Sequence, residues 1–233
     1  MKTIGLLGGM SWESTALYYR WINEGVNEKL GKLHSAKLVM ISVDFQEIEH
    51  LQHAHRWEEA GQILAAYARQ IQAAGADFLL LCTNTMHKVA DAIEEAIDIP
   101  FLHIADATAE AIKQRGISTV GLLGTRFTME EAFYAQRLQD KHGLTVLVPE
   151  EADRDLIHRV IYQELVKGII NERSRNEYLT IIHRLIQRGA EGIIAGCTEI
   201  GMLIQQQHIP VPLFDTAYIH ARRAVEMALD KPA

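Results

Sequence analysis

The sequence predicts an α/β fold made of two similar Rossmann-like halves, each with a parallel sheet. Short apolar runs that end in polar residues alternate with longer segments of helical character along the chain. One stretch occurs twice, because Gly75–Met86 (GADFLLLCTNTM) matches Gly189–Ile200 (GAEGIIAGCTEI) after a shift of 114 residues. Gly5–Ser11 likewise echoes Gly121–Thr128 after a shift of 116. Such a period is too long for a solenoid repeat, so it indicates two pseudo-symmetric halves.

Length and composition are those of a soluble globular protein. The chain has 233 residues, 48% of them hydrophobic and 23% charged, which is enough for two small domains. Its net charge of −7 argues against a nucleic-acid partner or an acidic membrane surface. Only two cysteines are present, Cys82 and Cys197, which is no disulfide framework. With no signal-peptide pattern and no apolar run of membrane-spanning length, we expect a cytoplasmic protein.

The first half is expected to contain four strands and four helices, each strand being a short apolar run and each helix a longer amphipathic segment. The expected strands are Thr3–Leu7, Lys37–Val43, Phe78–Cys82 and Pro100–Ile104. The expected helices are Trp12–Leu30, Arg56–Ala74, His87–Ala96 and Asp106–Arg115. The polar segment Asp44–Ala60 carries His50, His53 and His55, which do not complete a zinc spacing, so we expect a solvated helix surface and no metal.

The second half is expected to repeat this pattern. Its expected strands are Thr119–Leu123, Leu144–Val148, Gly192–Ala195 and Pro210–Phe214. Its expected helices are Met129–His142, Glu151–Lys167, Arg173–Arg188 and Ala217–Leu229. The alternation of strands and helices predicts parallel sheets with right-handed crossovers. We expect a first domain of residues 1–114 plus 211–233 and a second domain of residues 115–210.

Polar side chains that can transfer protons follow the strand Gly192–Ala195. Cys197, Thr198 and Glu199 stand there in a row. The carboxyl ends of strands in open α/β sheets are where ligands bind. A free cysteine is more commonly a buried core residue, but three consecutive polar residues do not suit a core strand. The sequence therefore predicts a functional site at Cys197.

A glycine turn follows the first expected strand. Gly8, Gly9, Met10 and Ser11 precede the helix Trp12–Leu30. Glycines let the backbone approach a ligand closely, and the amides of a helix N-terminus attract anions. The turn lacks the full G-x-G-x-x-G pattern and a P-loop lysine, so a carboxylate suits it better than a pyrophosphate. A tight turn without a ligand is the alternative.

Three motifs in this order resemble the aspartate/glutamate racemase family: GLLGGM near the start, TNTMH at residues 83–87, and GCTE at residues 196–199. The resemblance covers the whole chain. It implies two Rossmann-like α/β domains with the active site in the cleft between them. It also implies a homodimer and a cofactor-independent racemisation of an amino acid, a small-molecule substrate, with one acid/base residue from each half on opposite faces of Cα.

The matched motifs imply that Thr83 and Cys197 are the catalytic residues. A thiol is suited to this role because its ordinary pKa of about 8.5 can be lowered by helix N-termini. The residues expected to bind the substrate or stabilise its carbanion are Met10, Ser11, Gln52, Asn84, Thr85, Thr125, Lys167, Thr198 and Glu199.

The chain departs from the family motif Cys-Asn-Thr-x-His at its first position, where Thr83 stands. The internal repeat gives the same register, since 83 + 114 = 197. Cys82 is one residue earlier, and because neighbouring side chains of a strand point to opposite faces, we expect it to face the core. A threonine hydroxyl is a poor base unless something activates it. Exchange of the Cα proton should therefore be fast from one enantiomer and slow from the other.

Family members often carry an arginine that binds the side-chain carboxylate of the substrate, and no arginine stands at the matching place here. His50 or Gln52 are polar substitutes for it. Lys167 lies one position from the place of a family lysine. The substrate is thus aspartate or glutamate, or a broader set of amino acids.

Two other functions are open. One is a cysteine-dependent isomerase or decarboxylase of a small dicarboxylate, similar to maleate isomerase or arylmalonate decarboxylase. The other is a non-catalytic protein that binds small acids.

Overall fold

The computed structural model describes residues 1–230, and the chain divides into two compact units. Unit 1 contains Met1–Ile104 and the chain from His220 onward, whereas unit 2 contains Ala105–Ile219. The expected domains, 1–114 with 211–233 and 115–210, have different boundaries, and their residues 231–233 lie outside the described part. The boundaries differ because the segments near residues 106 and 213 make their strand pairs and ion pairs within unit 2.

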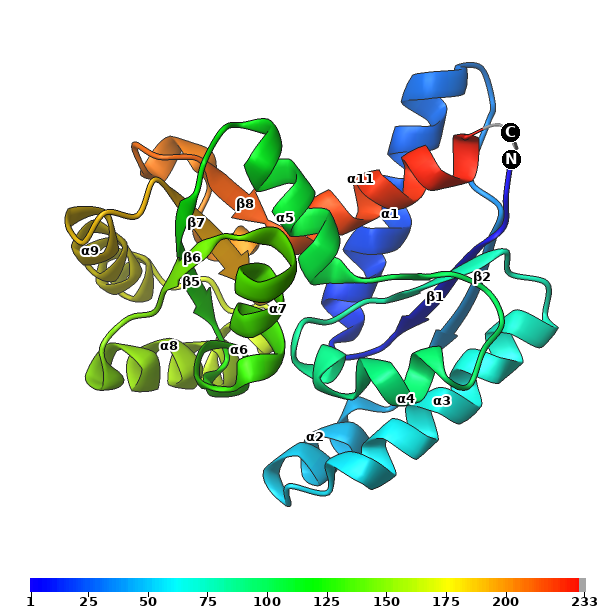
Figure 1. Ribbon diagram of the computed structural model, residues 1–233, viewed down its shortest axis with the longest axis horizontal. Coiled ribbons are helices and arrows are strands. Elements are labelled where there is room, and N and C mark those ends of the chain that lie inside the picture. Colours follow the sequence, from blue (N-terminus) through cyan, green and yellow to red (C-terminus); the bar gives the residue numbers. More distant parts are fainter. Residues whose placement is uncertain (231–233) are drawn as a thin grey trace. The chain divides into compact units, whose positions relative to one another are not determined.

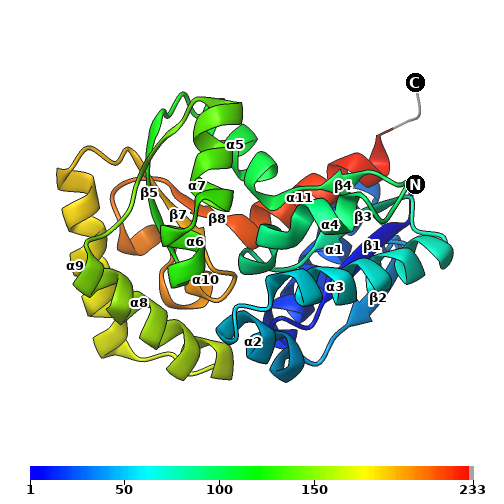
Figure 2. The same ribbon diagram turned by 60° about the horizontal axis from the view of Figure 1, so that its bottom comes forward.

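Unit 1 contains a parallel sheet in the order β2–β1–β3–β4 (Figures 1 and 2). Its strands are β1 (Ile4–Gly8), β2 (Leu38–Ser42), β3 (Phe78–Leu81) and β4 (Phe101–Leu102). The two central strands, β1 and β3, are buried along their whole length. This explains why both read as continuous apolar runs in the sequence.

Helices cover both faces of this sheet. They are α1 (Trp12–Leu30), α2 (Phe45–His53), α3 (Trp57–Ala73), the 3₁₀ helix η1 (Thr85–Val89), α4 (Ala90–Glu94) and most of α11 (Thr216–Leu229). Figures 1 and 2 show α1 and α11 on one face and α3 with α4 on the other. The buried stripe of α3 consists of Ala60, Leu64, Ala68 and Ile71, spaced by one helical turn, and it belongs to the same apolar core as the side chains of β3.

Unit 2 repeats this topology with a parallel sheet in the order β6–β5–β7–β8. Its strands are β5 (Thr119–Gly124), β6 (Thr145–Leu147), β7 (Gly192–Gly196) and β8 (Leu213–Asp215). Adding four to each strand number of the first sheet gives the order of the second. The repeat is in register as well, because Phe78, the first residue of β3, plus 114 gives Gly192, the first residue of β7. The prediction of two similar α/β halves is confirmed.

The helices of unit 2 also lie on both faces of their sheet. They are α5 (Ile104–Gln114), α6 (Arg126–Glu130), α7 (Ala132–His142), α8 (Glu151–Gln163), η2 (Leu165–Lys167), α9 (Glu172–Gln187), α10 (Ile200–Leu203) and η3 (Gln206–His208). Figures 1 and 2 show α8 and α9 on one face and α5 and α7 on the other. None of the helices within residues 1–230 has the length and apolar character needed to cross a membrane.

The first helix begins and ends at residues that cap it. The side chain of Ser11 caps α1 by accepting the backbone N–H of Ser14. Gly31 ends the helix with a positive φ of 71°, and its N–H donates to the carbonyl of Asn27 over 2.7 Å. The predicted span Trp12–Leu30 therefore agrees with the structure.

Two helices that were predicted as continuous are interrupted. The span Met129–His142 is broken at Glu131, whose backbone is extended with φ −90° and ψ 148°. The span Glu151–Lys167 is broken at Glu164, with φ −121° and ψ −66°. Glutamate is a good helix former, so neither break has a signal in the sequence.

Helices α5 and α7 are joined by a cluster of charges around Asp106. Arg137 binds both oxygens of this carboxylate over 2.8 Å, Lys141 lies 2.6 Å from Oδ2, and His142 Nε2 lies 2.9 Å from Oδ1. Burial alone would raise the pKa of Asp106, but the hydrogen bonds from Arg137, His142 and Lys141 hold it well below its ordinary range. The ionised carboxylate is therefore the form that stabilises the fold.

Replacing Asp106 by asparagine is expected to lower the free energy of unfolding at pH 7 by about 2 kcal/mol, the usual size for hydrogen bonds to a charged group. The unfolded state binds its proton near pH 3.9, above the folded pKa of Asp106. The stabilisation is therefore present above that pH and is lost as the pH falls below it, so the variant's deficit should shrink in acid. Urea denaturation at pH 7 and pH 3 measures this. The control Glu24→Gln, in an exposed pair with Arg20, should change little.

Candidate active site

Three predicted site residues of unit 1 lie at the carboxyl edge of its sheet. Met10 and Ser11 follow β1, and Thr83 follows the neighbouring strand β3. The two strand ends are held together because the N–H of Cys82 donates to the carbonyl of Leu7 over 2.9 Å. All of these residues are buried. The structure thus brings the glycine turn and the TNTMH motif together, as parallel strands require.

Gly9 makes the turn after β1 possible. It has a positive φ of 93°, and a Cβ at this position would collide with the backbone O and N of Val43. Its N–H donates to Thr15 Oγ1 over 2.8 Å, and the Thr15 hydroxyl in turn donates to the carbonyl of Ser11 over 2.8 Å. The turn is therefore tightly constrained, with the Ser11 side chain serving as the cap of α1.

The strand that carries Thr83 ends earlier than predicted. β3 ends at Leu81, and the N–H of Thr83 donates to the carbonyl of Leu81 over 2.9 Å, so the chain turns there. Strand alternation therefore does not apply to Cys82 and Thr83. Even so, the Cys82 side chain is fully buried, and burial raises the pKa of its thiol. Thr83 keeps 7% exposure.

Replacing Cys82 by alanine is expected to remove one buried sulfur atom and to cost about 1 kcal/mol of stability, as for other small core truncations. Catalysis should stay near the wild-type rate, because the Cys82 side chain is fully buried and cannot contact a substrate. Steady-state kinetics and iodoacetamide labelling check this. Rapid labelling of Cys82 that substrate prevents would place the thiol in the active site and contradict the expectation.

The other predicted residues of unit 1 are also buried. Asn84 follows Thr83, and Thr85 begins the 3₁₀ helix η1. Gln52 lies in α2 at 2% exposure, and its side-chain amide donates to Met86 Sδ over 3.0 Å. This contact links α2 to the segment after β3, which no sequence signal indicated.

In unit 2 the structure brings Thr125, Cys197, Thr198 and Glu199 to the ends of the neighbouring strands β5 and β7. Thr125 caps α6, its hydroxyl accepting the N–H of Thr128 over 3.3 Å. Lys167 differs from these residues, because it is exposed at the end of η2, a segment that contacts α10.

Cys197 and Glu199 form a hydrogen-bonded pair of proton-transfer groups. Cys197 Sγ donates to Glu199 Oε2 over 3.0 Å, and the Thr198 hydroxyl donates to the same oxygen over 2.7 Å. Glu199 is 2% exposed and Cys197 is 8% exposed. A carboxylate in this position is suited to accept the proton of the thiol, and Thr198 fixes its orientation.

The expectation that a helix N-terminus lowers the pKa of the Cys197 thiol is wrong. Burial, followed by the charge of Glu199 and its hydrogen bond, raises the pKa of the thiol well above its ordinary value. The backbone N–H of Glu199 acts in the opposite direction, but more weakly. The neutral thiol is therefore the resting form, and a thiolate forms only when its proton is removed.

Asp215 was missed in the sequence, although it ends the apolar strand β8 beside β7. Burial, together with the charge of Glu199, raises its pKa, against the hydrogen bonds of two backbone amides. Gly201 passes so close that a Cβ there would collide with Asp215 Oδ2. Asp215 thus adds a partly buried carboxyl group to the surroundings of Glu199.

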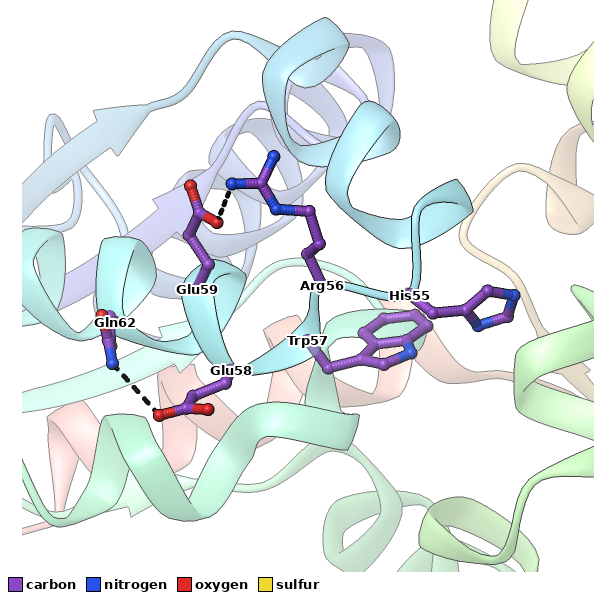
Figure 3. Close-up of a pocket in the computed structure, with 6 residues that line it drawn as sticks. All are labelled: His55, Arg56, Trp57, Glu58, Glu59 and Gln62. Atoms are coloured by element: carbon purple, nitrogen blue, oxygen red, sulfur yellow. Dashed lines mark hydrogen bonds and ion pairs between the residues drawn. The ribbon is translucent and has the colours of Figure 1, made fainter.

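A separate open pocket of about 580 Å³ lies in unit 1 at the beginning of α3 (Figure 3). It is lined by His55, Arg56, Trp57, Glu58, Glu59 and Gln62. Figure 3 shows that Arg56 forms an ion pair with Glu59 and that the Gln62 side-chain amide donates a hydrogen bond to Glu58. The predicted catalytic and substrate-binding residues are not among those that line it, so this pocket is not the candidate active site.

Comparisons with known proteins agree on one family. The model of the Asp/Glu/hydantoin racemase family matches residues 7–224. The crystal structure of a candidate Asp/Glu racemase from Yersinia pestis is 54% identical, with a TM-score of 0.93, over 99% of this chain and 100% of that one. An aspartate racemase homologue from Pyrococcus horikoshii is 35% identical, with a TM-score of 0.86 over the same shares. The broad-specificity amino-acid racemase RacX of Bacillus subtilis is 25% identical, over 70% of this chain and 69% of RacX.

Proposed function

The chain belongs to the Asp/Glu/hydantoin racemase family and is a racemase, and from this premise we propose that it interconverts the enantiomers of an amino acid by proton transfer at Cα. The observation that carries the proposal is the hydrogen-bonded pair of Cys197 and Glu199 at the end of β7. The names of the relatives support aspartate, glutamate or a broader set of amino acids as substrate.

Cys197 is proposed to remove the Cα proton of one enantiomer. Its own thiol proton first passes to Glu199, with which it already shares a hydrogen bond of 3.0 Å. The thiolate then takes the proton from Cα and becomes a thiol again. The carbanion is stabilised by hydrogen-bond donors at the substrate carboxylate, for which we propose Asn84, Thr85 and Thr198.

Thr83 is proposed to deliver a proton to the opposite face of Cα. Its hydroxyl relays a proton from water, because it is too weak an acid to remain deprotonated. One proton thus leaves Cα, one returns on the other face, and Glu199 finally releases its proton to solvent. Only proton transfers among side chains, substrate and water are involved, so the proposed reaction is independent of an organic cofactor.

The test is exchange of the Cα proton in heavy water over a panel of amino acids, followed by NMR and by chiral chromatography. Deuterium incorporation together with formation of the other enantiomer is the expected result. Release of carbon dioxide from a substituted malonate, without exchange of any amino acid, would instead indicate the decarboxylase function. Absence of both would contradict the proposal.

We further propose that the protein is a homodimer in a reducing compartment. The homodimer that the family resemblance implies supports the first part, and two buried free thiols support the second. Sedimentation equilibrium measures the mass in solution, and a value near the chain's 26.2 kDa would contradict the dimer.

A further inference from the structure

The imidazole of His87 connects two backbone segments of unit 1. His87 lies in η1, and its Nδ1 is 2.7 Å from the carbonyl oxygen of Thr83. Its Nε2 is 3.2 Å from the backbone nitrogen of Ile104, which donates to it. The ring is buried, with 3% exposure. It therefore bridges the segment after β3 and the beginning of α5.

These two contacts determine where the proton of His87 lies. A backbone N–H can only donate, so Nε2 must accept from Ile104 and carries no proton. A carbonyl oxygen can only accept, so the proton lies on Nδ1 and is donated to Thr83. The imidazole is thus neutral in one tautomer, and a second proton on Nε2 would oppose the N–H of Ile104.

A second histidine, His220, holds the end of strand β4, which lies just before Ile104 in the chain. His220 Nε2 is 2.7 Å from the carbonyl of Leu102, the last residue of β4, and Tyr18 donates its hydroxyl to His220 Nδ1 over 2.9 Å. Burial lowers the pKa of His220 to about 4, although the bond to Leu102 acts the other way, so this ring is neutral as well. The ring centroid of His103, the residue between Leu102 and Ile104, lies 4.4 Å from that of His87. Ile104 therefore follows a segment that is held at Leu102 and His103.

We propose that His87 is a positioning residue that fixes the orientation of the Thr83 peptide and, through it, of the Thr83 hydroxyl. The inference rests on the proposed function, in which Thr83 delivers the proton to one face of Cα. His87 acts through the main chain of Thr83, so its role is geometric. Loss of the bond lets the peptide rotate, and misplacement of a reacting group by an ångström is costly in rate.

Two substitutions of His87 by an amide side chain separate its hydrogen bond to Thr83 from its hydrogen bond to Ile104. In His87→Asn the amide nitrogen lies as many bonds from Cα as Nδ1 does, so it can still donate to the Thr83 carbonyl. In His87→Gln the amide lies at the distance of Nε2, so it can still accept from Ile104 but no longer reaches Thr83. The measured quantity is the ratio of inversion to Cα exchange with retention, starting from the enantiomer that Cys197 deprotonates. This ratio does not depend on the fraction of folded enzyme.

We expect His87→Gln to lower this ratio by about tenfold, and His87→Asn to keep it within about threefold of the wild type. The exposed control His53→Gln on α2 should leave it unchanged. In ¹⁵N NMR of the wild type, His87 should show a protonated Nδ1 and an unprotonated Nε2.

An unchanged ratio in His87→Gln would contradict the positioning role of His87 but not the proposed racemase function. A wild-type His87 with its proton on Nε2 would have the same meaning. Absence of exchange and inversion in the wild type would overturn the proposed function itself, and this role with it. The wild-type NMR measurement and His87→Asn keep the test decisive even when His87→Gln does not fold.

Discussion

Replacing Cys197 by serine is expected to lower kcat/KM for racemisation by at least about 10²-fold, the usual contribution of a general acid or base. A serine hydroxyl is far less acidic than a thiol, so Glu199 can no longer generate a base by accepting its proton. The change in volume is small, and the melting temperature should stay close to that of the wild type.

The pH dependence of the reaction gives a second measurement of the same pair. Because burial and the charge of Glu199 raise the pKa of Cys197, exchange begun by this thiol should increase with pH beyond the ordinary range of a cysteine. Glu199→Gln removes the negative charge, so the rise of the exchange rate with pH should move to lower pH. The maximum exchange rate should fall, because the proton acceptor is lost.

The matched control for Cys197→Ser is Cys82→Ala, which changes the other cysteine at a fully buried position. Wild-type activity in Cys197→Ser on a confirmed substrate would rule out the catalytic role. Loss of activity in Cys82→Ala, with Cys197→Ser unaffected, would assign the chemistry to the cysteine that precedes Thr83.

Replacing Thr83 by cysteine is expected to speed up exchange of the Cα proton from the enantiomer that faces residue 83, by about tenfold or more. In the wild type this exchange should be slow, because a threonine hydroxyl rarely loses its proton. Exchange with retention from the other enantiomer, which depends on Cys197, should change little.

Equilibrium limits how this asymmetry can be observed. The two enantiomers have the same free energy, so kcat/KM for the complete conversion must be equal in both directions, in the wild type and in Thr83→Cys. The bias is therefore sought in exchange without inversion, followed by NMR in heavy water from each pure enantiomer. Equal exchange from both enantiomers in the wild type, unchanged in Thr83→Cys, would refute the unequal roles. Thr83→Ser is the control, since it keeps a hydroxyl and should stay slow.

Much of the fold was determined by local patterns in the sequence. The apolar runs of β1 and β3 and the shift of 114 residues predicted two parallel sheets of the same topology. Ser11 and Gly31 set both ends of α1, because capping depends on residues adjacent in the chain. The polar residues after β3 and β7 followed from the same logic, since parallel strands end at one edge of their sheet.

Other properties depended on groups that meet only in the folded chain. The pKa of Cys197 was expected to be lowered, but burial and the Glu199 carboxylate reverse the direction. The breaks at Glu131 and Glu164 have no proline or glycine to mark them. The histidine of TNTMH was visible in the motif, yet its tautomer is decided by Ile104, 17 residues further along the chain. Periodicity and capping are set by neighbours in sequence, whereas desolvation and hydrogen-bond partners are set by neighbours in space, and only the tertiary structure supplies those.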